Sequence, residues 1–220
     1  MEAFQDMVKE IGDFLSDQEI ELLEKTFHPS VRSYKRGEIL PIRKSEMRKV
    51  FFLLCGTAYL IVEDASGETQ ILNYFVKGQA IYYSAMVQPN NGHCYVVAKY
   101  PCRVASLNMN QLRSFRQMPP AGSLSHLPEF IFQSCVAGLQ QHCHILQQKT
   151  TRNKILAFLH FQSLHQAGPS IKLPIPYSDL ADYLAVDRSS LMKEIARMCQ
   201  EGLIEKQSRL ITLLVTTPYF

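Results

Sequence analysis

The chain has 220 residues and a formal net charge of +3, with 23 Lys and Arg residues against 20 Asp and Glu residues. Hydrophobic residues make up 46% and charged residues 20%, an ordinary globular composition that excludes a low-complexity chain. The longest apolar runs, such as residues 50–55, are too short to cross a bilayer, and the first six residues form no cationic leader. We therefore predict a cytoplasmic protein without a membrane partner.

Near the N-terminus, Ser16 and Glu19 form a capping box that predicts a short helix. Short runs rich in β-branched and aromatic residues follow, separated by glycine and turn clusters. These runs are residues 31–34, 50–55, 57–62, 69–75, 95–100 and 102–107. Many short strands at this spacing predict an antiparallel roll or barrel through about residue 108.

From about residue 127 the glycines thin out, and apolar residues recur at alternating steps of four and three. The residues of this predicted dimer seam are Phe132, Val136, Leu139, Cys143 and Leu146. The pattern continues through Thr150 and Asn153, where it is polar. Such a seam predicts a parallel helix pair and hence a homodimer, and the alternative is one long helix lying on its own β domain.

A further helix is predicted from residue 154 to about 164, and residues 166–169 stop it. Residues 173–176 then form an extended connector, because residues before proline avoid the α region. Ser178 is expected to cap a short helix, which buries Leu180, Ala181 and Leu184 on one face.

After a three-residue turn, Asp187 is expected to cap a second helix. Its apolar positions Leu191, Ile195 and Met198 face inward, which leaves four polar residues outward. These are Arg188, Ser189, Lys193 and Arg197. The pattern predicts a helix-turn-helix whose second helix offers donors to guanine edges or phosphates, and residues 204–214 predict a hairpin, the wing.

Residues 150–220 hold eight Lys and Arg residues and six Asp and Glu residues, a net charge of only +2. Affinity for DNA would therefore depend on the placement of the charges and on two copies per dimer. The alternative to a DNA-binding helix-turn-helix is a helix-loop-helix that only packs in the core of its domain.

The chain resembles the Crp/Fnr (cyclic-AMP receptor/fumarate-nitrate regulator) family of bacterial transcription regulators over nearly its whole length. The motifs that carry the resemblance are Y-K-R-G-E-I-L (34–40), F-F-L-L-C-G-T-A-Y-L (51–60), S-G-E-T-Q-I-L (66–72), and L-A-D-Y-L-A-V-D-R-S-S-L-M-K-E-I-A-R-M-C-Q-E-G-L-I (180–204).

The resemblance implies an α+β fold. It consists of an N-terminal double-stranded β-helix (a jelly roll like that of cyclic-nucleotide-binding domains), a long dimerisation helix and a C-terminal winged helix-turn-helix. We place these parts in residues 1–124, 125–150 and 151–220. The expected function is that of a sequence-specific transcription regulator, not an enzyme, acting as a homodimer on a palindromic promoter site. RNA polymerase is an expected partner if the protein is an activator.

By position, Arg188, Ser189 and Lys193 fall where the family reads bases, while Tyr177 and Ser178 fall where it touches phosphates. The full set of residues expected to contact DNA is Arg188, Ser189, Ser190, Lys193, Tyr177, Ser178, Arg197 and Arg209. The second base-reading position often holds a glutamate, which accepts from cytosine amino groups. Ser189 can donate or accept, so the preferred half-site should differ from that of the cyclic-AMP receptor.

In nucleotide-binding members, a glutamate holds the ribose, and an arginine followed by a hydroxyl residue holds the cyclic phosphate. Tyr83 occupies the acidic position here, and Gly92 and His93 stand in place of the downstream pair. A buried phosphate would lack its guanidinium, so we do not expect cyclic AMP as the effector. The family geometry places any effector pocket at Tyr82, Tyr83, Ser84, Gly92, His93, Leu139 and Gln140.

A weakly polar organic effector is one interpretation of the aromatic content near this pocket, and a filled core without a ligand is the other. The six cysteines are scattered and none precedes Cys55, so the iron-sulfur signature of the oxygen-sensing members is missing; we expect reduced, buried thiols. His142 and His144 face different ways on a helix and cannot hold one ion together. We predict no metal ligands, although a haem- or metal-dependent sensor on the same scaffold stays open as an alternative.

Two rival classes are a small-molecule-binding protein or cupin-like enzyme built on the roll, without DNA binding, and a scaffold that dimerises without binding DNA. The enzyme would need converging His and Glu ligands, and His93 is the only histidine of the β region, with His28 at its margin. The outward Arg188, Lys193 and Arg197 argue against the scaffold. The sequence leaves open the effector, the promoter, activation or repression, and the DNA-binding conformation of the free protein.

Overall fold

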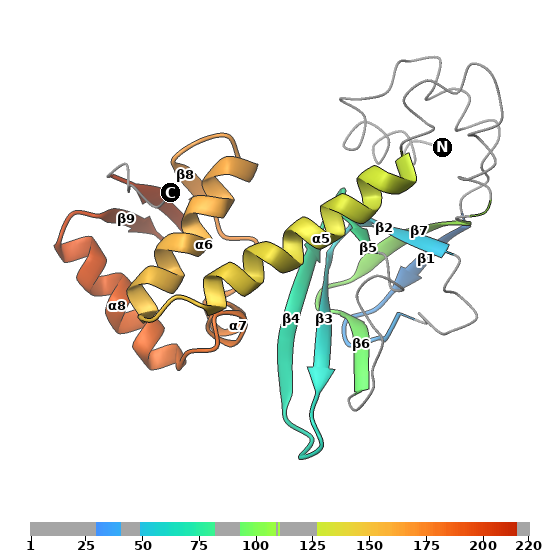
Figure 1. Cartoon of the computed structure of the whole chain (residues 1–220), viewed down its shortest axis with the longest axis horizontal. Coiled ribbons are helices and arrows are strands. Elements are labelled where there is room, and N and C mark those ends of the chain that lie inside the picture. Colours follow the sequence, from blue (N-terminus) through green and yellow to red (C-terminus); the bar gives the residue numbers. More distant parts are fainter. Residues whose placement is uncertain (1–29, 41–48, 82–92, 109, 111–126, 215–220) are drawn as a thin grey trace. The chain divides into compact units, whose positions relative to one another are not determined.

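The computed structural model describes residues 30–40, 49–81, 93–108, 110 and 127–214. The chain divides into two compact units, Met1–Gly138 and Leu139–Phe220. Figure 1 shows the strands of the first unit and the helices of the second, and the long helix α5 that contributes to both. The helix predicted at Ser16 and Glu19 lies outside the described residues.

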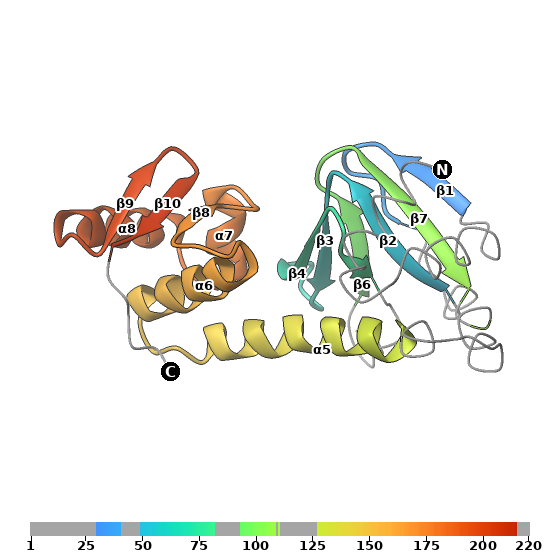
Figure 2. The ribbon, with the colours of Figure 1, turned by 90° about the horizontal axis from the view of Figure 1, so that it is seen from above.

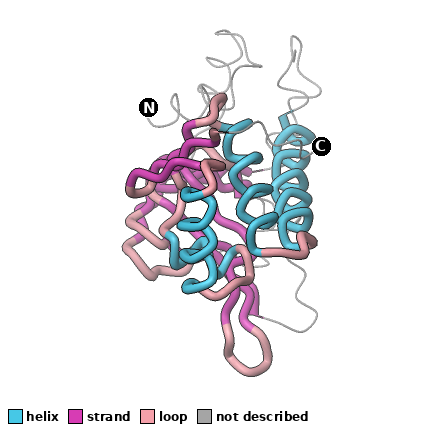
Figure 3. Tube along the Cα trace, turned by 90° about the vertical axis from the view of Figure 1, so that its left-hand side faces the viewer, coloured by secondary structure: helices cyan, strands magenta, loops and turns pink. Residues whose placement is uncertain are grey.

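The first unit is built from two antiparallel sheets. One sheet has the order β1-β7-β2-β5 and the other β4-β3-β6. The strands are β1 (Ser30–Tyr34), β2 (Lys49–Cys55), β3 (Thr57–Glu63), β4 (Thr69–Val76), β5 (Ala80–Ile81), β6 (His93–Ala98) and β7 (Cys102–Asn108). All six predicted strands are present, and among the strands that the structure describes in this unit the two-residue β5 was not predicted. Figures 1 and 3 show the β3–β4 hairpin projecting beyond the other strands of this unit.

The two sheets enclose a common apolar core. Phe51, Leu53 and Val104 from the first sheet pack in one cluster with Leu60 and Phe75 from the second. Alternate residues along each strand point to opposite faces of a sheet, so one face of each strand supplies this cluster. This arrangement confirms the predicted roll.

Gly56 makes the sharp connection between β2 and β3. Its φ of +91° lies in the region that residues with a Cβ rarely adopt. A Cβ at this position would lie 2.3 Å from the backbone oxygen of Pro101. The glycine therefore allows the two sheets to approach closely at this turn.

The long helix α5 spans Leu127–Leu146. Its residues buried in the chain are Ile131, Cys135, His142 and Ile145, each one position before a residue of the predicted seam. The seam itself stays open, since Phe132 is 47% exposed and Cys143 is exposed. The continuation of the seam to Thr150 and Asn153 is wrong, because Thr150 instead caps the next helix by accepting from the Asn153 N–H at 3.1 Å.

The second unit is a winged helix-turn-helix. Its remaining helices are α6 (Thr151–His165), α7 (Tyr177–Tyr183) and α8 (Arg188–Gln200), and its strands are β8 (Ser170–Lys172), β9 (Ile204–Gln207) and β10 (Leu210–Leu213). The strands form one antiparallel sheet in the order β8-β10-β9, which Figure 2 shows beside α8. The hairpin β9–β10 is the predicted wing, and β8 was not predicted.

The start of α7 differs from the prediction. The helix begins at Tyr177 directly after Pro176, which holds the capping position without a side-chain hydrogen bond. The Ser178 hydroxyl donates to Oδ1 of Asp179 at 3.0 Å instead. Pro176, with an extended ψ of 159°, thus takes the capping position that we assigned to the serine.

Candidate nucleic-acid interface

The two helices of the helix-turn-helix are joined by a tight turn. Ala185 adopts a left-handed φ of 49° in this turn. Leu180, Ala181 and Leu184 are buried as predicted and hold α7 against the rest of the unit. The turn ends at Asp187, where α8 begins.

The inner face of α8 is apolar and fully enclosed. Leu191, Ile195 and Met198 are each at most 1% exposed, which confirms the predicted inward face. Burying three such side chains stabilises the helix against its unit by several kcal/mol, on the order of 1.5–3 kcal/mol for each side chain. The outer face of α8 is thereby held in a fixed direction.

Arg188, Ser189 and Lys193 are exposed on the first two turns of α8. Among the residues that the structure describes, none of the three makes a side-chain hydrogen bond or an ion pair. Ser190 lies beside them and is half-buried, and its side chain likewise makes no hydrogen bond among the described residues. Their donors are thus available to an external partner.

Asp187 occupies the capping position of α8, as predicted, but its side chain makes no capping hydrogen bond. The first N–H groups of an α-helix have no partner inside the helix. Such groups, together with the positive end of the helix dipole, favour an anion such as a phosphate. The start of α8 therefore combines backbone and side-chain donors on one exposed end.

Two other predicted contact residues are engaged within the unit, next to the wing. The Tyr177 hydroxyl donates to the Ser208 carbonyl at 2.8 Å, and Arg209 Nη2 donates to the Leu173 carbonyl at 2.7 Å. Burial raises the pKa of Tyr177, so its phenol keeps the proton that it donates. Lys206, which we did not predict as part of this region, places Nζ 5.1 Å from the centre of the Tyr177 ring. Tyr177 thus connects the start of α7 to the turn of the wing.

One edge of α8 is acidic, and a cation from α6 neutralises it. Arg152 Nε donates to Glu194 at 2.6 Å, and its Nη1 and Nη2 donate to Glu201 at 2.7 and 3.0 Å. These hydrogen bonds raise the pKa of Arg152 and lower that of Glu201. Arg197, another predicted contact residue, donates to Glu201 at 3.0 Å.

The sequence analysis missed this network. The spacing of Glu194 and Glu201, seven residues apart, does place both on one edge of a helix. Nothing local indicates that their partner is Arg152, more than forty residues earlier. Because Arg197 also pairs with Glu201, Arg188 and Lys193 are the cations of α8 that have no ion pair among the described residues.

Most of the residues predicted to line an effector pocket lie outside the part of the chain that the structure describes. Tyr82, Tyr83, Ser84 and Gly92 lie outside the described residues, and His93 is described only through its backbone at the start of β6. On α5, Leu139 is half-buried and Gln140 is exposed.

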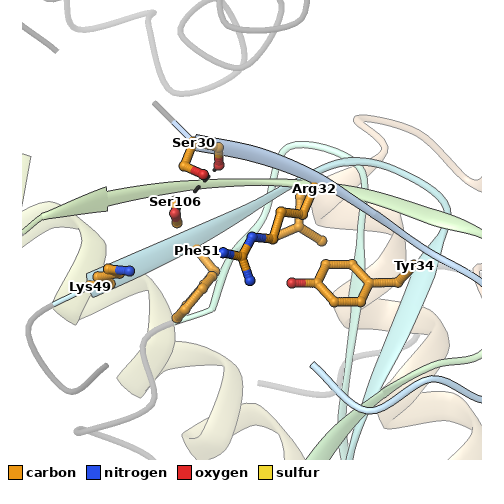
Figure 4. Close-up of a pocket in the computed structure, with 7 residues that line it drawn as sticks. Ser30, Arg32, Tyr34, Lys49, Phe51 and Ser106 are labelled. Atoms are coloured by element: carbon orange, nitrogen blue, oxygen red, sulfur yellow. Dashed lines mark hydrogen bonds between the residues drawn. The ribbon is translucent and has the colours of Figure 1, made fainter. Parts of the chain in front are cut away.

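The roll has a small hollow elsewhere, with about 30 Å³ of space. Its lining comes from the neighbouring strands β1, β7 and β2 (Figure 4). The lining residues are Ser30, Arg32, Tyr34, Lys49, Phe51, Val104 and Ser106. None of them belongs to the predicted effector pocket.

No group of three His, Cys, Asp or Glu residues is placed to hold a metal ion within the described part of the chain. His142 is buried and its Nε2 donates to the Tyr183 carbonyl, while His144 lies 3.3 Å from Gln148. None of the six cysteines, all of which the structure describes, forms a disulfide, but the prediction that they are buried is wrong for Cys55 and Cys143, which are exposed. No described helix is long and apolar enough to cross a membrane.

Comparisons with known proteins match both units. The cyclic nucleotide-binding domain family matches residues 31–118, and the Crp-like helix-turn-helix domain family matches residues 153–216. The regulatory protein HlyX of Actinobacillus pleuropneumoniae is 20% identical over 90% of this chain and 83% of its own length.

Two solved structures share the fold. FixK2 from Bradyrhizobium japonicum has a TM-score of 0.66 at 15% identity, covering 85% of this chain and 93% of its own. A cyclic nucleotide-binding domain containing protein from Listeria monocytogenes has a TM-score of 0.68 at 15% identity, covering 89% of this chain and 96% of its own. The order and fold of both units are therefore shared with these proteins.

Proposed function

Because the chain belongs to the Crp/Fnr family of DNA-binding transcription regulators, not enzymes, we propose that it reads a promoter site with the first two turns of α8. One observation carries this proposal. Arg188, Ser189 and Lys193 are exposed and uncommitted on a helix whose opposite face is fully buried. Side chains so placed can enter a major groove while the helix stays attached to its domain.

Each of the three residues has a distinct role in the proposal. Arg188 presents the planar fork that pairs with O6 and N7 of guanine. Lys193, one turn further on, donates to a guanine or to a phosphate. Ser189 is short and can donate or accept, so the base opposite it is selected less strictly than by a glutamate.

The protein acts as a homodimer in this proposal, through the seam on α5. The support is the open stripe beside the buried one, with Phe132 and Cys143 exposed and Val136, Leu139 and Leu146 half-buried. Two recognition helices related by a two-fold axis require an inverted repeat. If the protein is an activator, RNA polymerase is a further partner. In either case the proposed compartment is the cytoplasm.

We also propose that the roll does not use cyclic AMP. The support is the residue types Tyr83, Gly92 and His93 at the positions that hold the nucleotide in nucleotide-binding members of the family. The effector is then a different small molecule, or the roll carries none.

The proposal is tested with the full chain and a duplex site selected from random DNA. The double variant Arg188→Ala, Lys193→Ala should lose specific affinity by about 30-fold or more, because each base contact contributes about 1–3 kcal/mol. Its oligomeric state should be unchanged. Arg103→Ala is the matched control, since Arg103 is an exposed arginine on β7 of the roll. Unchanged affinity of the double variant would overturn the assignment of α8.

A further inference from the structure

The C-terminal end of α7 has every backbone carbonyl engaged. The carbonyls of residues 180–182 accept from the backbone N–H groups of residues 184–186, at 2.9 to 3.1 Å. The last carbonyls of a helix have no partner within the helix, so the turn itself supplies these three donors.

The next three carbonyls are held by side chains from two other helices. His142 on α5 donates from Nε2 to the Tyr183 carbonyl at 2.7 Å, because a carbonyl oxygen can only accept. Lys154 on α6 donates from Nζ to the Leu184 carbonyl at 2.9 Å and to the Ala185 carbonyl at 3.4 Å. We call His142 and Lys154 the turn clamp.

The His142 contact is buried and has two parts. His142 is 3% exposed and Tyr183 is 4% exposed. The two rings also stack, with 3.9 Å between their centroids and 11° between their planes. A buried hydrogen bond joined to a ring stack fixes both the distance and the orientation of α7 against this part of α5.

The Lys154 contact acts at the negative end of the α7 dipole. A cation is favourable there, and it also satisfies the carbonyl of Ala185, the residue with the left-handed φ of 49°. A left-handed conformation is unfavourable for alanine. Hydrogen bonds to this turn therefore help to keep a conformation that the chain would otherwise tend to leave.

The turn decides the direction in which α8 leaves. Only residues 184–187 separate α7 from α8, so a change in their backbone angles rotates the whole recognition helix. Seam residues Leu139, Cys143 and Leu146 lie on the same turns of α5 as His142. The helix that carries the predicted seam is thus also the helix that holds the turn.

We propose that His142 and Lys154 are positioning residues for DNA recognition. By holding the last carbonyls of α7 and its turn, they orient Arg188, Ser189 and Lys193 for the groove. The proposal rests on the proposed function of α8 and adds residues that never touch DNA. It assigns the link from α5 to the recognition helix to one hydrogen bond and one ring stack, and the link from α6 to two hydrogen bonds.

Paired variants separate this role from a general loss of packing. Lys154→Arg keeps a cationic donor, whereas Lys154→Met keeps the length and loses the donor. His142→Gln keeps a donor near the position of Nε2, whereas His142→Phe keeps the ring and loses the donor. Lys172→Met is the charge control, because Lys172 is an exposed lysine of the same unit.

Affinity for the selected duplex and for unrelated DNA is measured for each full-length variant, after folding is verified by thermal unfolding. We expect Lys154→Met and His142→Phe to bind the selected duplex about tenfold more weakly, with little change on unrelated DNA. Lys154→Arg, His142→Gln and Lys172→Met should stay close to wild type. The proposal would be overturned if Lys154→Met and His142→Phe both preferred the selected duplex over unrelated DNA as strongly as wild type does. If Lys154→Met does not fold, Lys154→Gln replaces it under the same criterion.

Amide hydrogen exchange provides a readout that needs no DNA. The clamp predicts faster exchange of the first turn of α8 in Lys154→Met and His142→Phe, with protection of α6 unchanged. Unchanged exchange in that turn would overturn the clamp even if wild type bound no DNA. A wild-type chain that selects no DNA would overturn the proposed function alone, so the two failures are distinguishable.

Discussion

At the scale of single residues, the predicted DNA contacts fall into two groups. Arg188, Ser189 and Lys193 are exposed and uncommitted among the described residues. Arg197, Arg209 and Tyr177, which also belong to the predicted set, donate to a carboxylate or a backbone carbonyl of their own unit. The first group is therefore the stronger candidate for base reading, and the second group shapes the surface around it.

Sequence spacing could predict that these side chains lie at the surface but could not identify their partners. Helical periodicity places Arg197 outside the apolar face, which is correct. Whether an exposed cation has a hydrogen-bond or ion-pair partner depends on residues far away in the chain, as with Arg209 and the Leu173 carbonyl. The same limit explains why the Tyr183 carbonyl could not be predicted as the partner of His142.

The Arg152 network predicts a specific dependence of stability on pH. Its hydrogen bonds lower the pKa of Glu201 in the folded chain below the usual 4.5. A group with a lowered folded pKa stabilises the fold above its unfolded pKa, and this contribution is lost as pH falls through the folded pKa. The thermal unfolding midpoint of wild type should therefore fall more steeply than that of Arg152→Met between about pH 5 and pH 3.

The matched control for this prediction is Arg188→Met, which removes an exposed arginine that has no ion pair among the described residues. Its pH profile should follow wild type, and high salt should reduce the difference between wild type and Arg152→Met. Identical slopes for wild type and Arg152→Met would show that the network does not contribute to folding.

At the scale of elements, periodicity identified most of the fold. The alternating strands of the roll and the inward face of α8 were predictable because burial imposes a period of two or of 3.6 on the chain. The short strands β5 and β8 were missed, since two or three residues carry no period. Thr150 as the cap of α6 was missed because Thr151 beside it is an equally good cap, and Pro176 was missed because Ser178 nearby is a residue type preferred at that position.

Helix α5 shows how a heptad pattern can be ambiguous. Its buried stripe and the predicted seam are adjacent, one residue apart; the seam steps by four and three, and the buried residues are spaced four, seven and three apart. One stripe packs within the chain, whereas the predicted seam is exposed at Phe132 and Cys143 and half-buried at its other residues. Periodicity alone could not decide which stripe faces which partner.

The open stripe makes a testable prediction about Cys143. In a parallel, in-register helix pair, a seam residue lies opposite its own counterpart, at a separation that suits a disulfide. Oxidation with copper-phenanthroline should remove two electrons and two protons from the paired thiols and give a covalent dimer on a non-reducing gel.

Cys143→Ser should abolish this covalent dimer, while Cys55→Ser, which removes the other exposed thiol, should not. A covalent dimer that persists in Cys143→Ser would place the contact between subunits elsewhere. The absence of any covalent dimer in wild type would argue against the in-register seam.

At the scale of the whole molecule, the DNA-binding end could be predicted more completely than the sensing end. The helix-turn-helix is local in sequence, so its helix faces and its turn can be predicted from about thirty consecutive residues. An effector site assembles from a loop, a strand and a helix that are far apart in the chain. The residue types at Tyr83 and Gly92 support our proposal that the roll does not use cyclic AMP, but they do not identify another ligand.

The central claim is that two copies of α8 read one inverted repeat, and selection of binding sites from random duplex DNA by the full chain tests it most directly. The account predicts enrichment of an inverted repeat whose half-site centres lie about 10–10.5 base pairs apart, or a multiple of that. Native mass spectrometry of the selected complex should then find two protein chains on one duplex. Enrichment of a single half-site bound by one chain, or no enrichment, would contradict the account.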